Sequence, residues 1–340
     1  MRSGAGNNNE SISESEETPA PGGPNPNLKS SRRSIVATAA LTALAADIVA
    51  AKVGFLPGPP LGNIAPTLTT ALDGGGMTSF LNNLIHFDYS NYAPYTDALI
   101  ARDLGATLLT AVLGYTFVQI VTWAANTDKG YLQPRDSRKI IHTLSAPLFI
   151  LFWPVFSDAA GARFFCAVVP LINGIRLYTA ASGTGETSLA AAVSRSGNIK
   201  EAVGGPFIYV CILAACILLF WTDSAAGIVA LSNLAAGDGL ADLVGRRLGG
   251  NNKWPGIFSD KSVAGTIAFW VGATMTSVGL LLWTRSFAAG TFVLQATGLE
   301  LVATVAAISG VAALLELLPW ADDNYTVPMA AGVLAMLFLH

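Results

Sequence analysis

The sequence predicts an all-α integral membrane protein, a polytopic transmembrane helical bundle of about eight or nine spans. Of its 340 residues, 52% are hydrophobic and only 12% are charged, and the mean hydropathy is +0.51. Soluble globular domains carry about 25% charged residues, so about half of the usual solubilising charge is missing. The apolar residues also fall into separate runs, most of them close to the ~20 residues that a helix needs to cross the hydrocarbon core of a bilayer.

The beginning of the chain differs in composition from the rest. Residues 1–33 are rich in Gly, Asn, Ser, Glu and Pro, which is typical of a disordered tail. Several glutamates make this tail a poor organellar transit peptide, because such peptides are normally poor in acidic residues. The tail therefore does not identify a compartment. Residues 34–340 are expected to form a single transmembrane domain.

Apolar runs alternate with polar loops along the rest of the chain. The first two runs are separated by residues 54–97, which are rich in Gly, Pro, Asn and Asp and are expected to form an extramembrane loop or a partly re-entrant segment. The third, fifth and last runs are marginal in length for a span. The sixth run begins at about residue 225 and continues into a polar stretch. The other runs lie at about 34–53, 104–125, 140–156, 164–181, 206–221, 263–283, 298–318 and 325–339.

The positions of Lys and Arg indicate the orientation of the bundle. If the N-terminus lies on side A and the chain crosses at each run, side A receives fourteen of the 19 Lys and Arg residues and side B receives four. Because cytoplasmic loops carry an excess of Lys and Arg, side A is expected to be the cytosol, or the stroma of a plastid. The same alternation places all the polar motifs described below on side A.

Composition also excludes some classes of protein. The formal net charge of −3 argues against nucleic-acid binding, which requires a strongly basic face. Cys166, Cys211 and Cys216 lie inside apolar runs at a spacing that fits no metal site, so they are expected to be buried and unreactive. The sequence shows no internal repeat, so it gives no support to a transporter built from obvious repeats.

The most unusual polar stretch, residues 237–250, stands at the end of the sixth apolar run. Asp238, Asp242 and Arg246 are four residues apart, so they share one face if the helix continues. Two carboxylates one turn apart can hold a divalent cation, and Arg246 with Arg247 can grip phosphate oxygens. Glycines on both sides would let the backbone approach a phosphate and offer amide N–H groups. These glycines include Gly237 and Gly239.

A second polar motif lies at the start of the third run. Arg138, Lys139 and His142 are spaced three or four residues apart, so they cluster on one helical face. Basic residues commonly flank spans as topology anchors, which is the ordinary explanation for Arg138 and Lys139. His142 lies about one turn into the run, where an anchor is not needed, so it is the better candidate for a functional role.

Three further motifs lie on side A, and each has an ordinary alternative. The loop around Arg195 could be a simple polar turn. Lys253 and Lys261 precede the seventh run, and Lys261 opposes the helix dipole there unless a phosphate partner offsets the conflict. The last motif is a group of carboxylates between the final two runs, which could be a solvated turn that caps the last helix. Its members are Glu316, Asp322 and Asp323.

Together these motifs place acidic groups for a cation, basic groups for phosphates and an apolar body for a lipid on one side of a membrane. This combination predicts a lipid phosphotransferase or nucleotidyltransferase, with a carboxylate or His taking the proton from an attacking hydroxyl. Neither GxxxxGK[ST] nor the kinase catalytic-loop motif occurs, so neither soluble-kinase architecture is present. A transporter of an anionic solute is least expected, because only Asp47, Arg176 and a few other polar residues lie deep in the runs.

The polar motifs described above resemble those of a known family. The likeness is to the membrane-embedded phytol kinase, farnesol kinase and dolichol kinase group, whose signature is similar to the stretch that begins at Gly237. It covers residues 138–328 in the right order, whereas residues 1–130 carry no match. The segments that carry the resemblance are 138–142, 195–206, 237–249, 260–265 and 316–328.

The resemblance implies transfer of a phosphoryl group to an isoprenoid alcohol, with CTP as the expected donor and Mg²⁺ as the expected ion. The Asp-Asp-Asn sequence at 322–324 and the short chain favour phytol or farnesol over dolichol. Phytol would point to a plastid membrane and to salvage of phytyl phosphate towards tocopherol, with the endoplasmic reticulum as the alternative location. A cytidylyltransferase that acts on a lipid phosphate needs the same site chemistry and stays open as an alternative.

These motifs supply the candidate site residues. Asp238 and Asp242 are expected to hold the cation and to act in catalysis, with His142 as the base or a transition-state contact. Asp322 and Asp323 are expected to add to the metal site. The residues expected to bind the nucleotide and its phosphates are Gly237, Gly239, Arg246, Arg247, Lys253, Lys261, Arg138, Lys139 and Arg195.

Overall fold

The computed structural model describes the motif-bearing part of the chain, from residue 96 onwards. The described residues are 96–126, 132–159, 161–185, 187–194, 198–288, 292, 294–319 and 322–339. Within these ranges the named elements are all helices, and an isolated bridge of the strand type joins Lys253 to Ser262. The all-α prediction is therefore confirmed for this part of the protein. The predicted tail, the first predicted span and nearly all of the loop 54–97 lie outside the described residues.

The helices follow the apolar runs closely. The long helices are α4 (Asp97–Asn126), α5 (Pro134–Leu151), α6 (Ala162–Ala181), α8 (Gly205–Leu219), α11 (Val263–Phe287), α12 (Gly298–Leu315) and α13 (Asp323–Phe338). Between α8 and α11 the chain forms α9 (Ala225–Ser232), the π-helical turn η5 (Asn233–Gly237) and α10 (Asp238–Leu248). The short elements are η3 (Trp153–Val155), α7 (Ser188–Val193), η4 (Ile199–Val203) and η6 (Gly256–Phe258).

Six helical segments in the described part of the chain are long and apolar enough to cross a membrane. They confirm a polytopic transmembrane bundle. The third and last predicted runs form α5 and α13, which have 18 and 16 residues and are not among the six. The total of eight or nine spans stays a prediction, because the first predicted span is not described.

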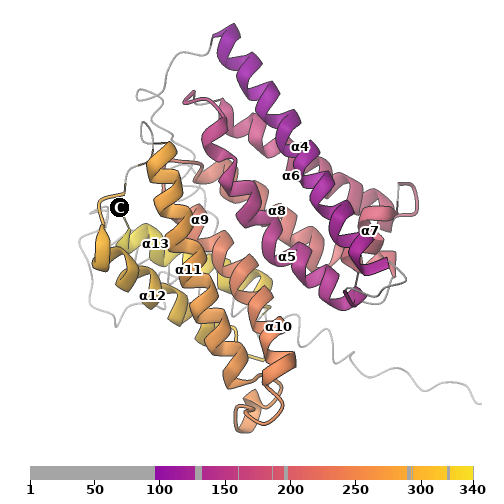
Figure 1. Ribbon diagram of the computed structural model, residues 1–340, viewed down its shortest axis with the longest axis vertical. Helices are drawn as coiled ribbons and strands as arrows, with labels where there is room; N and C mark the ends of the chain where they lie inside the picture. The colour runs from indigo at the N-terminus through magenta and orange to yellow at the C-terminus, as the bar shows by residue number, and fades with distance from the viewer. Residues whose placement is uncertain are drawn as a thin grey trace, which may run out of the picture.

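The segment Ala225–Leu248, made of α9, η5 and α10, is the centre of the bundle. In its most apolar window 72% of the residues are buried, against 17–39% in the other five candidate spans. Its small residues let neighbouring helices approach closely, and it contacts α5, α8, α11 and α13. In Figure 1 the group α4, α5, α6 and α8 lies beside the group α11, α12 and α13, with α9 and α10 where the two groups meet. The polar stretch at the end of this segment is thus held by both groups.

The ends of the helices place the polar motifs. Helix α5 begins at Pro134, before the predicted start of the third run at about residue 140, so Lys139 and His142 both stand well inside the helix. The Ser262 side chain caps α11 and the Asp322 side chain caps α13, each by accepting a hydrogen bond from a backbone N–H of the first turn. Lys261 therefore directly precedes one capped helix, and Asp323 begins the other.

The three cysteines differ in environment. Cys166 and Cys216 are buried, as predicted, but Cys211 is exposed on α8. The prediction that all three are buried is wrong for Cys211. An apolar run does not show which face of a transmembrane helix meets lipid rather than protein, and Cys211 lies on an outward face.

Candidate active site

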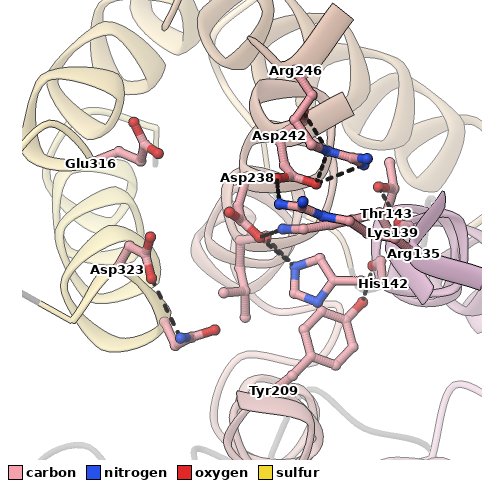
Figure 2. A network of polar contacts seen from close by, with 12 residues as sticks. Arg135, Lys139, His142, Thr143, Tyr209, Asp238, Asp242, Arg246, Glu316 and Asp323 are labelled. Carbon is pink, nitrogen blue, oxygen red and sulfur yellow. Dashed lines mark hydrogen bonds and ion pairs between the residues drawn. The ribbon is translucent and has the colours of Figure 1, made fainter. Parts of the chain in front are cut away.

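Asp238 is the residue around which the polar side chains assemble. It is the first residue of α10, directly after the π-helical turn η5. Its Oδ2 atom lies 2.9 Å from Lys139 Nζ and 2.9 Å from His142 Nε2. Lys139 and His142 are one turn apart on α5 and both point towards Asp238 (Figure 2). The structure thus joins two motifs that are about one hundred residues apart in sequence, as the predicted clustering on side A requires.

The contacts of His142 determine which of its ring nitrogens carries the hydrogen. Nε2 faces the Asp238 carboxylate and also lies 3.1 Å from the backbone oxygen of Leu234. Both neighbours are acceptors, so we assign the hydrogen to Nε2. In the neutral imidazole this leaves the lone pair on Nδ1, which is then the ring atom able to accept a proton.

Two further carboxylates approach Asp238 from the other side of the site. Glu316 follows the end of α12 and Asp323 begins α13, and each can place a carboxylate oxygen within 4.8 Å of the others and of Asp238. Figure 2 shows both side chains on the opposite wall of the site from Lys139 and His142. Carboxylate oxygens are the ligands that Mg²⁺ prefers in proteins, so these three residues fit a divalent cation.

Lys261 contacts this acidic group directly. Its Nζ contacts Glu316 Oε1 and lies 3.7 Å from Asp323 Oδ2. Burial raises the pKa of Glu316, with Asp238 and Asp323 adding to the rise, and the Lys261 ammonium only partly opposes it. Burial and the Asp238 carboxylate likewise raise the pKa of Asp323. Burial works against the charged form of Lys261, but the neighbouring carboxylates outweigh it and raise its pKa. Negative charge is therefore crowded here beyond what Lys261 neutralises.

A second network lies one turn further along α10. Arg246 pairs with Asp242 at 2.9 Å and with Asp136 of α5 at 2.8 Å. Arg247 also pairs with Asp136, at 2.7 Å, and Arg135 lies 3.9 Å from Asp242. The confirmed helix over Asp238–Leu248 puts Asp242 and Arg246 on one face, as predicted. Both arginines are held by carboxylates, so any phosphate would share them with Asp136.

Asp136 is a residue of this network that the sequence did not single out. It stands in the first turn of α5, where an acidic residue is an ordinary partner of the helix dipole. It is buried, and its two oxygens face two different arginines. The one available signal was its position two residues before Arg138, just outside the basic motif at 138–142.

The remaining candidate residues lie in different places. Arg138 is half-buried on α5, and Arg195 lies outside the described residues. Lys253 is exposed and donates to the backbone oxygen of Asp260. Asp322 accepts a hydrogen bond from the backbone N–H of Asn324 and so caps α13. The roles proposed for them in binding phosphate or metal stay predictions.

The glycines of the central stretch allow close helix packing. A Cβ on Gly239 would lie 1.8 Å from Thr143 Oγ1, so α5 can approach α10 at this height only because no side chain is present. A Cβ on Gly237 would lie 2.8 Å from the ring of Phe269. The contact at Gly239 brings α5, and with it His142, up to Asp238, whereas the contact at Gly237 packs α11 against η5. They explain the two glycines by packing, and their predicted phosphate contacts stay predictions.

A small cavity opens beside the acidic group. Its volume is about 220 Å³, and its walls are partly charged and partly apolar. The charged wall consists of Asp260, Lys261, Glu316 and Asp323. The apolar wall consists of Ile257, Phe258, Leu317, Leu318 and Pro319. The cavity could therefore hold the polar end of an otherwise apolar molecule next to the carboxylates.

Comparison with known proteins identifies close relatives. The chain is 37% identical to a probable chloroplastic phytol kinase of Triticum aestivum over 241 residues, which cover 71% of this chain and 79% of the relative. It is 35% identical to the chloroplastic phytol kinase 1 of Arabidopsis thaliana over 243 residues, covering 71% and 78%. A probable chloroplastic phytol kinase 1 of Glycine max matches at 37% identity, covering 69% and 77%. No protein-family model and no solved structure matches the chain.

Proposed function

The chain belongs to the phytol kinase family of membrane enzymes, which transfer a phosphoryl group to an alcohol, and on this basis we propose that it phosphorylates phytol with CTP as the donor. The reaction joins the phytol hydroxyl oxygen to the γ-phosphorus of CTP, breaks the bond to the β-phosphate oxygen and releases CDP. The family resemblance found in the sequence is confirmed by these relatives. The identity of the alcohol and of the nucleotide is the proposal.

The proposal is supported above all by the acidic group, in which carboxylate oxygens of Asp238, Glu316 and Asp323 lie within 4.8 Å of one another. Lys139 and Lys261 flank these carboxylates. Enzymatic phosphoryl transfer depends mainly on positioning and on neutralising charge on the phosphates, rather than on covalent chemistry by the protein. Carboxylates and lysines drawn from four separate segments supply these requirements at one place. Crowding three carboxylates is costly to the fold of a membrane bundle, and this cost favours a functional role for them.

Each side chain has a role in this proposal. Asp238, Glu316 and Asp323 would hold Mg²⁺, which when bound neutralises the phosphate oxygens of the nucleotide. Lys139 and Lys261 lie against the same carboxylates and can neutralise the remaining charge of the triphosphate. Arg246 and Arg247, held by Asp136, offer further N–H donors along α10 to the outer phosphates.

His142 is the proposed acceptor of the alcohol proton. Its Nε2–H is held by Asp238, so Nδ1 is the basic atom, and the carboxylate stabilises the imidazolium that forms. The pairing resembles other catalytic imidazoles, which are oriented by a carboxylate on the nitrogen that does not react. The alcohol would bring its hydroxyl to this site while its chain remains in an apolar environment.

The membrane context agrees with an isoprenoid substrate. The carboxylates sit at the ends of α12 and α13 and at the start of α10, while the outer faces of the candidate spans are apolar and exposed. An alcohol dissolved in the bilayer could thus reach the acidic group at the surface without leaving the lipid. We propose a plastid membrane, by analogy with relatives named chloroplastic, and a role in salvaging phytol towards tocopherol.

The test compares alcohol substrates, nucleotide donors and positions of the radioactive label with the purified protein. Phytol, farnesol, geranylgeraniol and dolichol are each assayed with CTP and ATP in detergent. CTP labelled at the α- or the γ-phosphorus then distinguishes a kinase from a cytidylyltransferase. We expect phytol with CTP to give the highest kcat/KM and only the γ label to enter the lipid. Transfer of the α label, or no phosphorylation of any of the four alcohols, would reject the proposal.

A further inference from the structure

We propose that Tyr209 is a positioning residue for the reaction, because it fixes both the backbone and the ring of His142. Tyr209 lies in the second turn of α8, outside every motif that the sequence singles out, and it is buried. The inference rests on the proposed role of His142 as the proton acceptor. It adds α8 to a site otherwise built by α5, α10 and the ends of α12 and α13.

The first observation is the position of the Tyr209 hydroxyl. Its oxygen lies 3.0 Å from the backbone nitrogen of Ala146 and 3.1 Å from the backbone oxygen of His142. In an α-helix these two groups are hydrogen-bond partners, since residue i+4 donates to residue i. The hydroxyl of a side chain from another helix therefore lies directly against the hydrogen-bonded turn that begins at His142.

The hydrogen-bond roles of the hydroxyl follow from its neighbours. The His142 carbonyl can only accept, so the phenolic hydrogen is donated to it, and the Ala146 N–H donates to the phenolic oxygen. The Ser145 hydroxyl lies 3.0 Å away and can donate to the remaining lone pair. Tyr209 thereby makes three contacts with α5 within one turn, which holds the Cα of His142 at a fixed distance from α8.

The second observation concerns the ring of Tyr209. Its centroid lies 4.6 Å from that of the His142 imidazole, at an interplanar angle of 47° (Figure 2). This contact covers one face of the imidazole and restricts rotation about its side-chain torsions. The imidazole is thus held by Asp238 at Nε2, by Tyr209 at its face and by α5 at its backbone, so Nδ1 has one direction available to it.

A purely structural role would give a different result from a positioning role, and a double-mutant cycle separates the two. Tyr209→Phe keeps the ring and removes the hydroxyl, while His142→Asn removes the imidazole. A structural contribution of the hydroxyl lowers stability by the same amount with or without His142. A positioning contribution appears in kcat and depends on the presence of the imidazole.

The experiment measures kcat and the KM values for phytol and CTP in the wild type, both single variants and the double variant. Each kcat is referred to the fraction of protein that binds the nucleotide, so that partial misfolding does not enter the comparison. We expect Tyr209→Phe to lower kcat about tenfold, or about 1.4 kcal/mol, with KM values within about twofold. We expect no further loss of kcat when the same change is made in His142→Asn.

The matched control is Tyr178→Phe. Tyr178 is on α6, is exposed at the outside of the bundle and contacts the ring of Phe207 rather than the site. Tyr178→Phe removes the same phenolic hydroxyl as Tyr209→Phe but away from the site, so kcat should stay at the wild-type value.

The outcomes of the cycle separate this inference from the proposed function. If His142→Asn lowers kcat but Tyr209→Phe lowers it by an equal factor in both backgrounds, or leaves it unchanged, the positioning role is wrong and the proton-acceptor role stands. If His142→Asn leaves kcat unchanged, the proton-acceptor role fails and the positioning role fails with it.

Discussion

Two groups of charged residues lie near the two ends of α5, and they are built differently. The buried group lies beyond the C-terminal end of α5 and consists of the charged residues Asp103, Arg163 and Asp223 with the hydroxyl of Ser157; all are buried except Asp223, whose side chain is 32% exposed. Asp103 is 0% exposed, and its two oxygens accept from the backbone N–H and the hydroxyl of Ser157 at 2.6 and 2.7 Å. Arg163 is also 0% exposed, and it donates to Asp223 at 2.7 Å and to the backbone oxygen of Leu218. Acidic and basic groups here are matched by close partners.

The site group, Lys139, His142, Asp238, Lys261, Glu316 and Asp323, lies near the N-terminal end of α5. Its three carboxylates crowd together, and Lys261 is 36% exposed in its side chain. In the buried group the charged atoms are hydrogen-bonded within the protein and stabilise the fold, because an unpaired buried charge would be costly. The site group keeps an excess of negative charge facing a cavity. In this bundle the functional site is therefore distinguished by negative charge that the protein leaves partly unmatched.

The largest expected effect comes from removing the carboxylate at the centre of the site group. Asp238→Asn takes the charged partner from Lys139 and His142 and one of three carboxylates from the acidic group. We expect kcat/KM for phytol phosphorylation to fall by at least about a thousandfold while the protein stays inserted and folded. The matched control in the buried group is Asp103→Asn, which should destabilise the protein and leave kcat per folded molecule unchanged. Full activity of Asp238→Asn would show that the site group is not needed for catalysis.

The next effect is on stability rather than on activity. Arg163→Met leaves the Asp223 carboxylate without its guanidinium partner and the Leu218 carbonyl without a donor. Arg163 is fully buried, whereas the Asp223 side chain is 32% exposed, so the carboxylate left behind stays partly hydrated. We therefore expect a loss of about 2 kcal/mol in the free energy of unfolding, below the full penalty for a completely buried pair. Thermal denaturation in detergent measures the loss. An unchanged melting temperature would show that the buried group is dispensable to the fold.

A smaller effect is expected from the same kind of change in the site group. Lys261→Met removes the ammonium that lies against Glu316 and Asp323. Because the lysine is partly exposed, the stability lost should be only about 1 kcal/mol.

Mg²⁺ provides the control for this variant. Excess Mg²⁺ should restore the stability of Lys261→Met by neutralising the same carboxylates, whereas it should not restore the stability of Arg163→Met. KM for the nucleotide should rise about tenfold. Equal behaviour of the two Met variants towards Mg²⁺ would remove the distinction between the groups.

The smallest effect is a dependence of stability on pH. Burial raises the pKa of Glu316 and of Asp323, so the folded protein binds protons more tightly at these sites than the unfolded chain does. Without a divalent cation, stability should therefore fall as pH rises from the usual carboxyl range, about 4, through the raised values. Melting temperatures measured from about pH 4 to about pH 8, a range that spans the usual and the raised carboxyl pKa values, test this. The slope should be smaller in Asp323→Asn and with Mg²⁺, and an equal slope in all three would contradict the raised values.

Much of the fold could be predicted because it rests on composition and periodicity. The apolar runs gave the helices, and the spacing of Asp238, Asp242 and Arg246 correctly placed Asp242 and Arg246 on one helical face. Less predictable were the ends of the helices. Helix α5 begins at Pro134, because the first turn tolerates polar residues that a hydropathy profile excludes from a span.

The site was predicted in outline, but its partners were not. The motifs around His142, Asp238 and Glu316 were all identified, yet sequence spacing cannot show which side chains meet across different helices. Only the packing of α10 against α5 and near α13 shows that Glu316 and Asp323, rather than Asp242 or Asp322, group with Asp238. Tyr209 had no signal at all, since a tyrosine inside an apolar run looks like any other core residue.

Asp238 and Asp323, from α10 and α13, are proposed to bind one and the same cation. The most direct test is electron paramagnetic resonance of Mn²⁺ titrated into metal-stripped protein in the presence of a non-hydrolysable CTP analogue. We expect the wild type to bind one Mn²⁺ tightly, and Asp238→Asn and Asp323→Asn each to weaken that same site by about tenfold or more. If either variant binds Mn²⁺ as the wild type does, the two carboxylates do not share a cation and the proposed site is wrong.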